Sequence, residues 1–445
     1  MTKKISLKIF KLIFFFFLTG ASLFARELSL KDFIHLAIKN NLDLKASQEE
    51  VKAAKLEYEA AKGARFPRLK LEEYFYRSDI PSQVFMFKLN QEDFKASDFE
   101  IKKLNNPSAR NNFETRLTIE LPIWLGGKIG AEIKAAEFHL KAIEDLYQRK
   151  EEEIILEVYK AYLFALLSKE SIKVAESSIA EAKEALKIAK ARYEAGTALL
   201  SDVKRAEVYL ATAEESLVRA KNYYSVAKKR LEVITNTFLG DFEVAELTNL
   251  PEVNLEKIKK VALENRKDLK ALEKEIQAKK YSYRSVLSEN LPQITAFASY
   301  GLNDKDKPFG SEGNGYILGL GLTWKFDLGL TTLRKAESEL KRAASLEEKY
   351  RYLKDLINLQ IEKAYADYLN ANYKLKSAEA RISASEEVLK IMKARYQNGL
   401  VRMLDLLDAQ TQLDQARFGR IEALKEIYEA YAELLFASGL IKEEL

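Results

Sequence analysis

The sequence Ala191-Arg192-Tyr193-Glu194-Ala195-Gly196 occurs a second time, little changed, as Ala394-Arg395-Tyr396-Gln397-Asn398-Gly399. The two stretches lie 203 residues apart. Nearer the N-terminus the interval between matching residues is 225, as between Pro67 and Pro292. The interval changes once, by 22 residues, so the first copy contains 22 residues that the second copy lacks. A repeat of this length is a doubled structural module rather than a solenoid unit, and we expect functional sites built from pseudo-symmetric pairs of residues.

The duplication predicts the domain organisation. We expect a first repeat at residues 26–239, a linker at residues 240–253 and a second repeat at residues 254–440. Residues 1–25 have the features of a secretory signal peptide, with a lysine-rich start, an apolar run from Leu12 to Leu18 and small residues before the end. The apolar run is shorter than the ~20 residues of a spanning helix. An uncleaved anchor is the alternative interpretation.

Composition excludes several classes of function. The chain has 72 basic and 67 acidic residues, and four of the lysines lie in the signal peptide, so the remaining net charge is +1. This balance gives no support for a nucleic-acid partner. The chain has no cysteine, and its two histidines, His35 and His139, lie far apart in helical patterns. We therefore predict no disulfide, no metal site, no cofactor and no enzymatic activity.

Each repeat is predicted to begin with a helix. Apolar residues follow helical spacing from Leu30 to about Ala64, with Ser29 as N-cap, and the matching helix runs from Leu255 to about Asn290, with Asn254 as N-cap. Both helices are expected to end just before a proline, Pro67 or Pro292, because proline disfavours helical backbone at the preceding residue.

After each proline the period of the pattern changes from 3.6 to 2. Apolar residues alternate with polar or small ones from Phe113 to Ile123 and from Tyr316 to Phe326, and weaker partner strands are predicted at residues 69–77 and 294–302. Strands of ~9–11 residues can cross a membrane, and this alternation is typical of an outer-membrane barrel strand. A soluble β-hairpin packed on helices is the alternative. Four strands cannot close a transmembrane barrel, because the smallest barrels need about eight, so two chains with eight strands or three with twelve are required.

The longest predicted elements follow the strands. Neither Pro nor Gly interrupts the charged, apolar-periodic pattern from about Thr331 to Asn398, and only Gly130 lies in the matching stretch from about Lys128 to Ala195. A helix of this length measures ~100 Å. Each helix is expected to turn at a glycine and return through a shorter helix, at residues 201–237 and 403–438. The spacing of small and apolar residues suits coiled-coil packing.

The whole chain after the signal peptide resembles the TolC-like outer-membrane efflux proteins. The residues that carry the resemblance are the two Arg-Tyr-x-x-Gly turns, the stretch from Gly399 to Ala409 that reads GLVRMLDLLDA, and the Leu-Pro sequence at Leu291. The resemblance implies a mostly α protein with a small β part. Three chains would close a 12-stranded β-barrel in the outer membrane, and their helices would form a long α-helical tunnel through the periplasm.

The resemblance also implies a passive exit duct of a tripartite efflux or type I secretion system. Its partners would be two further copies of this chain, a periplasmic adaptor, an inner-membrane transporter and outer-membrane lipid. The alternatives are a periplasmic coiled-coil adaptor, which carries a single hairpin, and a coiled-coil structural protein, which leaves the repeated strands unexplained.

The functional residues are expected at the helix-to-helix turns. Asp405 and Asp408, spaced i, i+3 on one helix face, match the carboxylates that form the periplasmic constriction of the family. Solvated residues at a helix N-terminus are the alternative. We expect Asp202, the counterpart of Asp405, to pair across helices with Arg402 and to help hold the entrance shut.

The turns themselves form the predicted periplasmic tip. Gly196 and Gly399 permit a positive φ there. The residues just before them, Arg192, Tyr193, Arg395 and Tyr396, are candidates for adaptor contact, although a tyrosine at helical spacing also suits simple packing.

The 22 additional residues lie between Arg77 and Asn112, in the segment that joins the first strand pair. Five apolar residues make this segment less polar than a free loop: Phe85, Met86, Phe87, Phe94 and Phe99. We predict that it folds over the barrel mouth.

Overall fold

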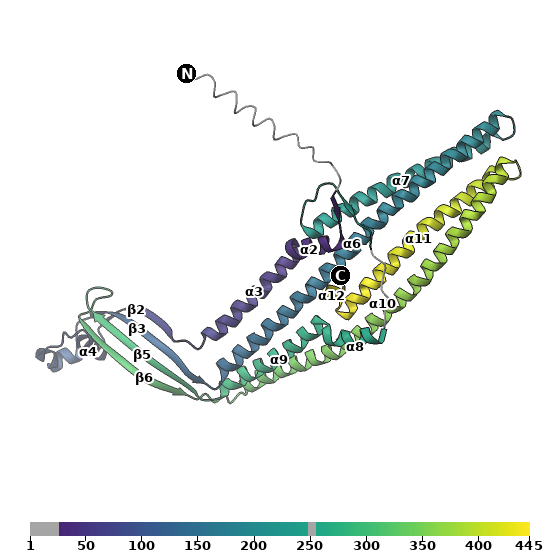
Figure 1. Ribbon diagram of the computed structural model, residues 1–445. Helices are drawn as coiled ribbons and strands as arrows, with labels where there is room; N and C mark the ends of the chain where they lie inside the picture. Colours follow the sequence, from purple (N-terminus) through teal and green to yellow (C-terminus); the bar gives the residue numbers. More distant parts are fainter. Residues whose placement is uncertain (1–25, 248–254) are drawn as a thin grey trace, which may run out of the picture. The chain divides into compact units, whose positions relative to one another are not determined.

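The computed structural model describes residues 26–247 and 255–445 (Figure 1). The predicted signal peptide at residues 1–25 and the predicted N-cap Asn254 lie outside the described residues. In chain order the elements are β1 (Arg26–Leu28), α2 (Leu30–Asn40), α3 (Leu42–Gly63), β2 (Arg68–Ser78), α4 (Pro81–Asn90), η1 (Ala96–Phe99), α5 (Ile101–Asn105), β3 (Arg110–Leu125), α6 (Lys128–Glu194), α7 (Leu200–Thr235), β4 (Phe242–Val244), α8 (Leu255–Asn265), α9 (Lys267–Leu287), η2 (Ser288–Asn290), β5 (Gln293–Asp304), β6 (Gly313–Thr323), α10 (Thr331–Gln397), α11 (Met403–Ser438) and α12 (Ile441–Glu444).

The chain forms two compact units, and each unit draws segments from both repeats. Unit 1 comprises the described part of Met1–Lys45 together with Glu151–Ala262 and Leu359–Leu445. Unit 2 comprises Ala46–Lys150 and Leu263–Asn358. The two repeats therefore do not correspond to the two compact units, because each unit contains residues of both repeats.

The first helix of each repeat is broken, and the prediction of one continuous helix was wrong in both copies. The breaks fall at Asn41 and Arg266, which are 225 residues apart, so the break itself is duplicated. At Asn41 the backbone takes extended ψ, the side-chain amide donates to the Ile234 carbonyl at 2.8 Å, and its oxygen accepts the Leu44 N–H at 3.0 Å. These bonds replace the helical bonds that the break removes. The N-cap at Ser29 is confirmed, since its hydroxyl accepts the Asp32 N–H.

The strands of unit 2 form one antiparallel sheet in the order β2-β3-β5-β6, so the two predicted strand pairs lie side by side. The ladders are long: β3 pairs with β2 from Glu120 to Arg110 and with β5 on its other side. The prediction that the last strand extends to Phe326 was wrong, because β6 ends at Thr323. Thr323 pairs with Gln293, the first residue of β5, so no partner remains for a longer strand.

Side chains of the sheet leave much apolar surface uncovered in the protomer. On β6, Leu318, Leu320 and Leu322 are 70%, 77% and 68% exposed. The outer edges of β2 and β6 have no strand partner among the described residues. Within those same residues, no helix is long and apolar enough to cross a membrane.

In unit 1 the ends of the long helices pack as two hairpins, α6 beside α7 and α10 beside α11 (Figure 1). The bounds of all four helices agree with the prediction to within two residues, and α6 and α10 each contain 67 residues. Small residues make the close contacts near the turns, where Ala185 and Ala189 of α6 pack with Ala206 of α7. We call α6–α7 hairpin 1 and α10–α11 hairpin 2.

Unit 1 also contains a parallel strand pair that the sequence pattern did not predict. β1 pairs with β4, which lies within the predicted linker. Phe242 of β4 packs on Phe33 with ring centroids 5.5 Å apart, and the buried Tyr162 hydroxyl of α6 donates to the Ala245 carbonyl at 2.7 Å. Three-residue strands are too short to show a period, so their burial could be recognised only in the fold.

Candidate functional site

The two helix-to-helix turns have the same backbone. Gly196 and Gly399 have φ of +73° and +75°. In each turn the next residue donates its N–H to the carbonyl five positions earlier, Thr197 to Arg192 at 2.8 Å and Leu400 to Arg395 at 2.9 Å. This Schellman arrangement satisfies the last carbonyls of the helix and needs a residue that tolerates positive φ. The sequence prediction that glycine forms both turns is confirmed.

The structure brings the two turns into contact through Arg192. Its guanidinium lies over the Tyr396 ring, 4.8 Å from the centroid, and donates to the Tyr396 carbonyl. It also donates to the Thr197 carbonyl at 3.3 Å, within its own turn. The pseudo-symmetric residues are arranged differently, because Tyr193 and Arg395 are both exposed. The four predicted residues therefore separate into a pair in contact, Arg192 and Tyr396, and an exposed pair, Tyr193 and Arg395.

Tyr396 is only 2% exposed, and its hydroxyl has no hydrogen-bond partner among the described residues. Burial raises the pKa of Tyr396, and the nearby Asp202 carboxylate raises it further. A buried hydroxyl without a partner costs stability.

Within the protomer, Arg402 does not pair with Asp202 as expected. Its guanidinium contacts Asp405 at 3.1 Å, and the Asp405 carboxylate also accepts the Arg402 backbone N–H at 2.9 Å. Asp202 likewise accepts the N–H of Leu199 at the start of its own helix, at 3.3 Å. Each carboxylate thus caps its own helix N-terminus, and the Arg402 side chain follows the nearer one. Asp202 and Arg402 still line one cavity of about 490 Å³ between the turns.

Asp405 and Asp408 lie on the face of α11 that points away from the packed core. Asp408 is exposed and Asp405 half-buried, whereas Leu406 and Leu407 between them are buried. The hydrogen bond and charge of Arg402 hold the pKa of Asp405 below its ordinary value. Asp408 therefore presents an exposed carboxylate on this side of the helix, whereas the Asp405 carboxylate is bonded to Arg402.

A second polar cluster joins the hairpins farther from the turns, and sequence reasoning missed it. Asp414 of α11 accepts hydrogen bonds at 2.5 Å from both Ser178 of α6 and Tyr209 of α7. Burial raises the pKa of Asp414, against the two hydrogen bonds, which lower it. The cluster borders a groove of about 620 Å³ between α7 and α11. An aspartate between helical apolar residues was the only sequence signal, and many solvated residues share it.

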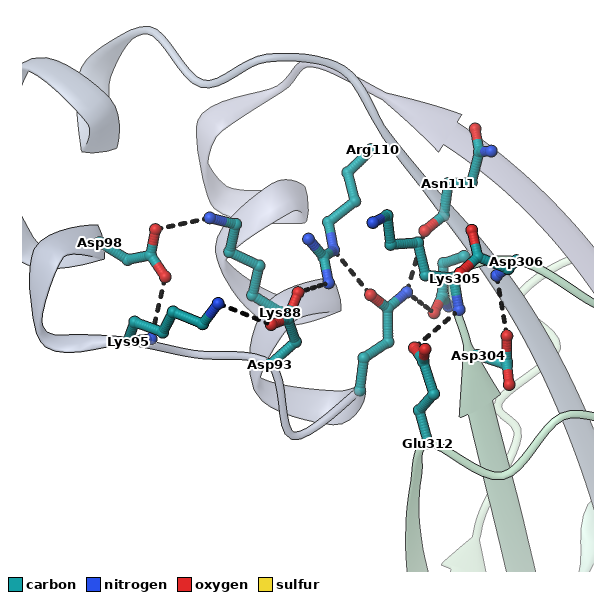
Figure 2. Close-up of polar contacts among 12 residues, drawn as sticks. Lys88, Asp93, Lys95, Asp98, Arg110, Asn111, Asp304, Lys305, Asp306 and Glu312 are labelled. Carbon is teal, nitrogen blue, oxygen red and sulfur yellow. Dashed lines mark hydrogen bonds and ion pairs between the residues drawn. The ribbon is translucent and has the colours of Figure 1, made fainter.

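The additional segment of the first repeat folds onto the strand ends of unit 2 (Figure 2). Gln91, 2% exposed, donates to the Asn111 carbonyl at 2.9 Å and accepts from Arg110 at 2.6 Å. Arg110 also pairs with Asp93 at 2.5 Å. The Asn90 carbonyl lies so near Gly313 of β6 that a Cβ there would come within 2.1 Å. The segment therefore contacts the ends of both β3 and β6.

Aromatic packing gives the segment its own small core. The Phe94 ring meets Phe85 and Phe99 edge to face, with centroids 4.9 and 5.1 Å apart. Lys88 pairs with Asp98 at 2.6 Å across the same cluster (Figure 2). We call residues 79–109 the outer cap. It is an ordered substructure that contains α4, η1 and α5, and its predicted position over a barrel mouth stays a prediction.

Comparison with known proteins agrees with this architecture. The alkaline protease secretion protein AprF of Pseudomonas aeruginosa is 21% identical over 94% of this chain and 86% of its own length. The cobalt-zinc-cadmium resistance protein CzcC of Cupriavidus metallidurans is 23% identical over 74% of this chain and 78% of its own. The solved structure of the Campylobacter jejuni outer membrane channel CmeC superposes with a TM-score of 0.78 at 17% identity, covering 93% of this chain and 86% of that one.

The family model for outer membrane efflux proteins matches residues 33–237 and 259–440. These two ranges follow the two repeats, and together they contain the four strands of the antiparallel sheet, the hairpins and both turns. A single-hairpin adaptor and a soluble coiled-coil protein are set aside by this match. The chain belongs to the outer membrane efflux protein family.

Proposed function

We propose that this protein is the outer-membrane exit duct of a tripartite efflux or type I secretion system. In this role it is a passive conduit with no enzymatic activity, coupled to a periplasmic adaptor and an inner-membrane transporter. The proposal depends on one observation: the same chain contains a sheet with open edges and exposed leucines and two long helical hairpins. Of the relatives, AprF is an alkaline protease secretion protein and CzcC a cobalt-zinc-cadmium resistance protein, so the family relationship does not identify one cargo.

The open sheet edges support a homotrimer. In a bilayer every backbone N–H and C=O must be paired within the protein. The edges of β2 and β6 satisfy this requirement when they pair with each other between copies, and three copies of a four-stranded sheet supply twelve strands. The exposed leucines of β6 then face outer-membrane lipid.

Asp405 and Asp408 are the proposed periplasmic constriction. In a trimer the two positions make two rings of three carboxylates, which attract cations and disfavour anions. The Arg402 side chain on Asp405 compensates part of this charge. Asp202 and Arg402 remain the proposed lock of the entrance. Within one chain they line the same cavity, and Arg402 pairs with Asp405 instead of Asp202.

The exposed residues at the turns and the residues in contact there have separate proposed roles. Tyr193 and Arg395 are exposed and available for adaptor contact. Arg192 and Tyr396 hold the two turns together. In unit 2, the outer cap narrows the proposed barrel mouth, which agrees with its contacts to the ends of β3 and β6.

Single-channel conductance in a planar bilayer tests the proposal. The wild-type protein should give small, cation-selective steps, and Asp405→Asn/Asp408→Asn should lose the selectivity. The control, Glu443→Gln/Glu444→Gln, removes the same charge from α12 and should behave as wild type. Absence of conductance from correctly inserted trimers of all three proteins would mean either that other contacts seal the tip or that the strands do not form a pore.

A further inference from the structure

The two faces of the four-stranded sheet differ in chemistry. Leu71 pairs with Leu117 across the β2–β3 ladder, and the next pair along it is Glu72 with Arg116. Because successive residues of a strand point to opposite faces, the leucines lie on one face and the charged residues on the other. The exposed leucines of β6 lie on the same face as Leu71. In a barrel the apolar face meets lipid, so the charged face is the lumen face.

The outer cap packs on the lumen face. Asn112, four residues before Arg116, lies on this face and accepts a hydrogen bond from the Gln91 side chain at 2.8 Å. Tyr76, four residues after Glu72, lies there too and stacks on Phe87 of α4 with ring centroids 6.1 Å apart. Both contacts are made from inside the sheet, so the cap extends toward the lumen rather than toward lipid.

Helix α4 crosses the mouth end of the sheet from one edge strand to the other (Figure 1). It begins shortly after β2 ends, and the carbonyl of its last residue, Asn90, lies 2.1 Å from where a Cβ on Gly313 of β6 would be. β2 and β6 are the two edges of the sheet. Exposed apolar side chains lie at both ends of the helix, since Ile80 at its N-cap is 51% exposed and Leu89 is 42% exposed.

The dimensions of a twelve-stranded barrel decide what these ends meet. Strands ~4.8 Å apart and tilted ~40° give a perimeter of about 75 Å and a radius of about 12 Å. The four strands of one copy then span a straight line of about 21 Å. The ten residues of α4 measure about 15 Å along the helix axis. Three such helices form a triangle with a gap of about 6 Å at each corner, which two side chains in contact fill.

The same triangle leaves little open space at its centre. The middle of each side lies about 6 Å from the barrel axis, and a helix with its side chains has a radius of 5–6 Å, on the order of the same distance. The three helices therefore meet or nearly meet at the axis.

We propose that the outer caps of three copies join head to tail, with Leu89 of one copy against Ile80 of the next, and close the extracellular mouth of the duct. This inference rests on the trimeric duct proposed above. One contact repeated about a threefold axis closes into a ring. The duct then has a second closure, separate from the carboxylates of α11, which departing cargo must displace and which keeps external solutes out.

The absence of cysteine from the chain allows this contact to be tested by a disulfide. In Ile80→Cys/Leu89→Cys the two thiols of one chain lie nine residues apart on a helix, about 13 Å along its axis. A disulfide needs Cα atoms within about 7 Å, so it can form only between copies. Oxidation should give covalent trimers on a denaturing gel and lower single-channel conductance at least fivefold, with recovery on reduction. Each single substitution should stay monomeric on the same gel.

The gel separates failure of the ring from failure of the duct. Heat-resistant trimers of the double variant without a disulfide would refute the head-to-tail contact and leave the duct intact. Covalent trimers with unchanged conductance would refute the closure of the mouth. Absence of heat-resistant trimers from the wild-type protein would refute the trimeric duct itself.

A charge placed at the contact gives an independent test that the periplasmic tip does not influence. Ser299 lies on the lumen face, where its hydroxyl is 3.1 Å from that of Thr118, and Ser299→Cys places one thiol beneath the caps. A charged, membrane-impermeant methanethiosulfonate added outside whole cells reports access to this thiol. Adding Leu89→Glu should raise the labelling rate severalfold, because three carboxylates then lie in the apolar contacts.

Met86→Glu is the matched control for this charge. Met86 is an apolar residue of the same helix and is 50% exposed, but it lies away from the helix ends. The substitution should change the labelling rate less than twofold. Equal rates for the two variants would contradict the contact between Leu89 and Ile80.

Discussion

Replacing Arg192 with alanine should weaken the contact between the two helix-to-helix turns. The side chain donates from a charged guanidinium to the Tyr396 carbonyl and lies 4.8 Å from the centre of the Tyr396 ring. A hydrogen bond from a charged group contributes about 1.5–3 kcal/mol, and an exposed cation–π contact about 0.5–1 kcal/mol. Because Arg192 is half-exposed, we take the lower sum, about 2 kcal/mol, which corresponds to a shift of ~30-fold in the equilibrium between the turns in contact and the turns apart.

The duplication supplies the control for this experiment. Arg395 occupies the same place in the second repeat, is exposed, and has no hydrogen bond or ion pair from its side chain in the part of the chain that the structure describes. Open probability is measured in planar bilayers for Arg192→Ala and Arg395→Ala, with heat-resistant trimers on a gel as the check of assembly. We expect a rise of about 30-fold for Arg192→Ala and less than twofold for Arg395→Ala, from the energies above. Equal values for the two variants would refute the assignment of Arg192 as the residue that holds the turns together.

Three further predictions follow from contacts in the two units. Tyr162→Phe should lower stability by about 1 kcal/mol, because the Ala245 carbonyl loses its buried donor; a thermal unfolding midpoint equal to that of wild type would contradict this. Gly313→Ala should push the Asn90 carbonyl away and loosen the outer cap, raising conductance, whereas Gly315→Ala, which meets nothing within 4 Å, should not. The pKa of Asp414 is raised in the folded protein, so the protonated side chain stabilises the fold. This contribution is fully present below the ordinary pKa of 3.8, and it is lost as the pH rises through the raised pKa. The difference in unfolding midpoint between wild type and Asp414→Asn should therefore grow in favour of wild type on acidification from pH 7, and parallel curves would show that Asp414 does not titrate in this range.

The sequence by itself determined the long helices and strands, because their apolar pattern extends over many consecutive residues. A helix of 67 residues repeats its apolar spacing many times, and a membrane strand alternates over its whole length, so both were predicted close to their observed bounds. The turn glycines were equally clear, because only a residue that tolerates positive φ can close the turn. The internal duplication reinforced each of these patterns by showing it twice.

The tertiary structure decided the features that depend on partners far away in the chain. The helix break at Asn41 is stabilised by a carbonyl 193 residues away, and Asp414 is bonded to side chains 205 and 236 residues away. The strand pair β1–β4 is held by burial against α6 rather than by any period of its own. Arg402 was predicted to pair with Asp202 but pairs with Asp405, because the Asp405 carboxylate already accepts the Arg402 backbone N–H at the start of α11. Sequence pattern records the period of an element, whereas the partner of a polar side chain depends on which helices the fold brings beside it.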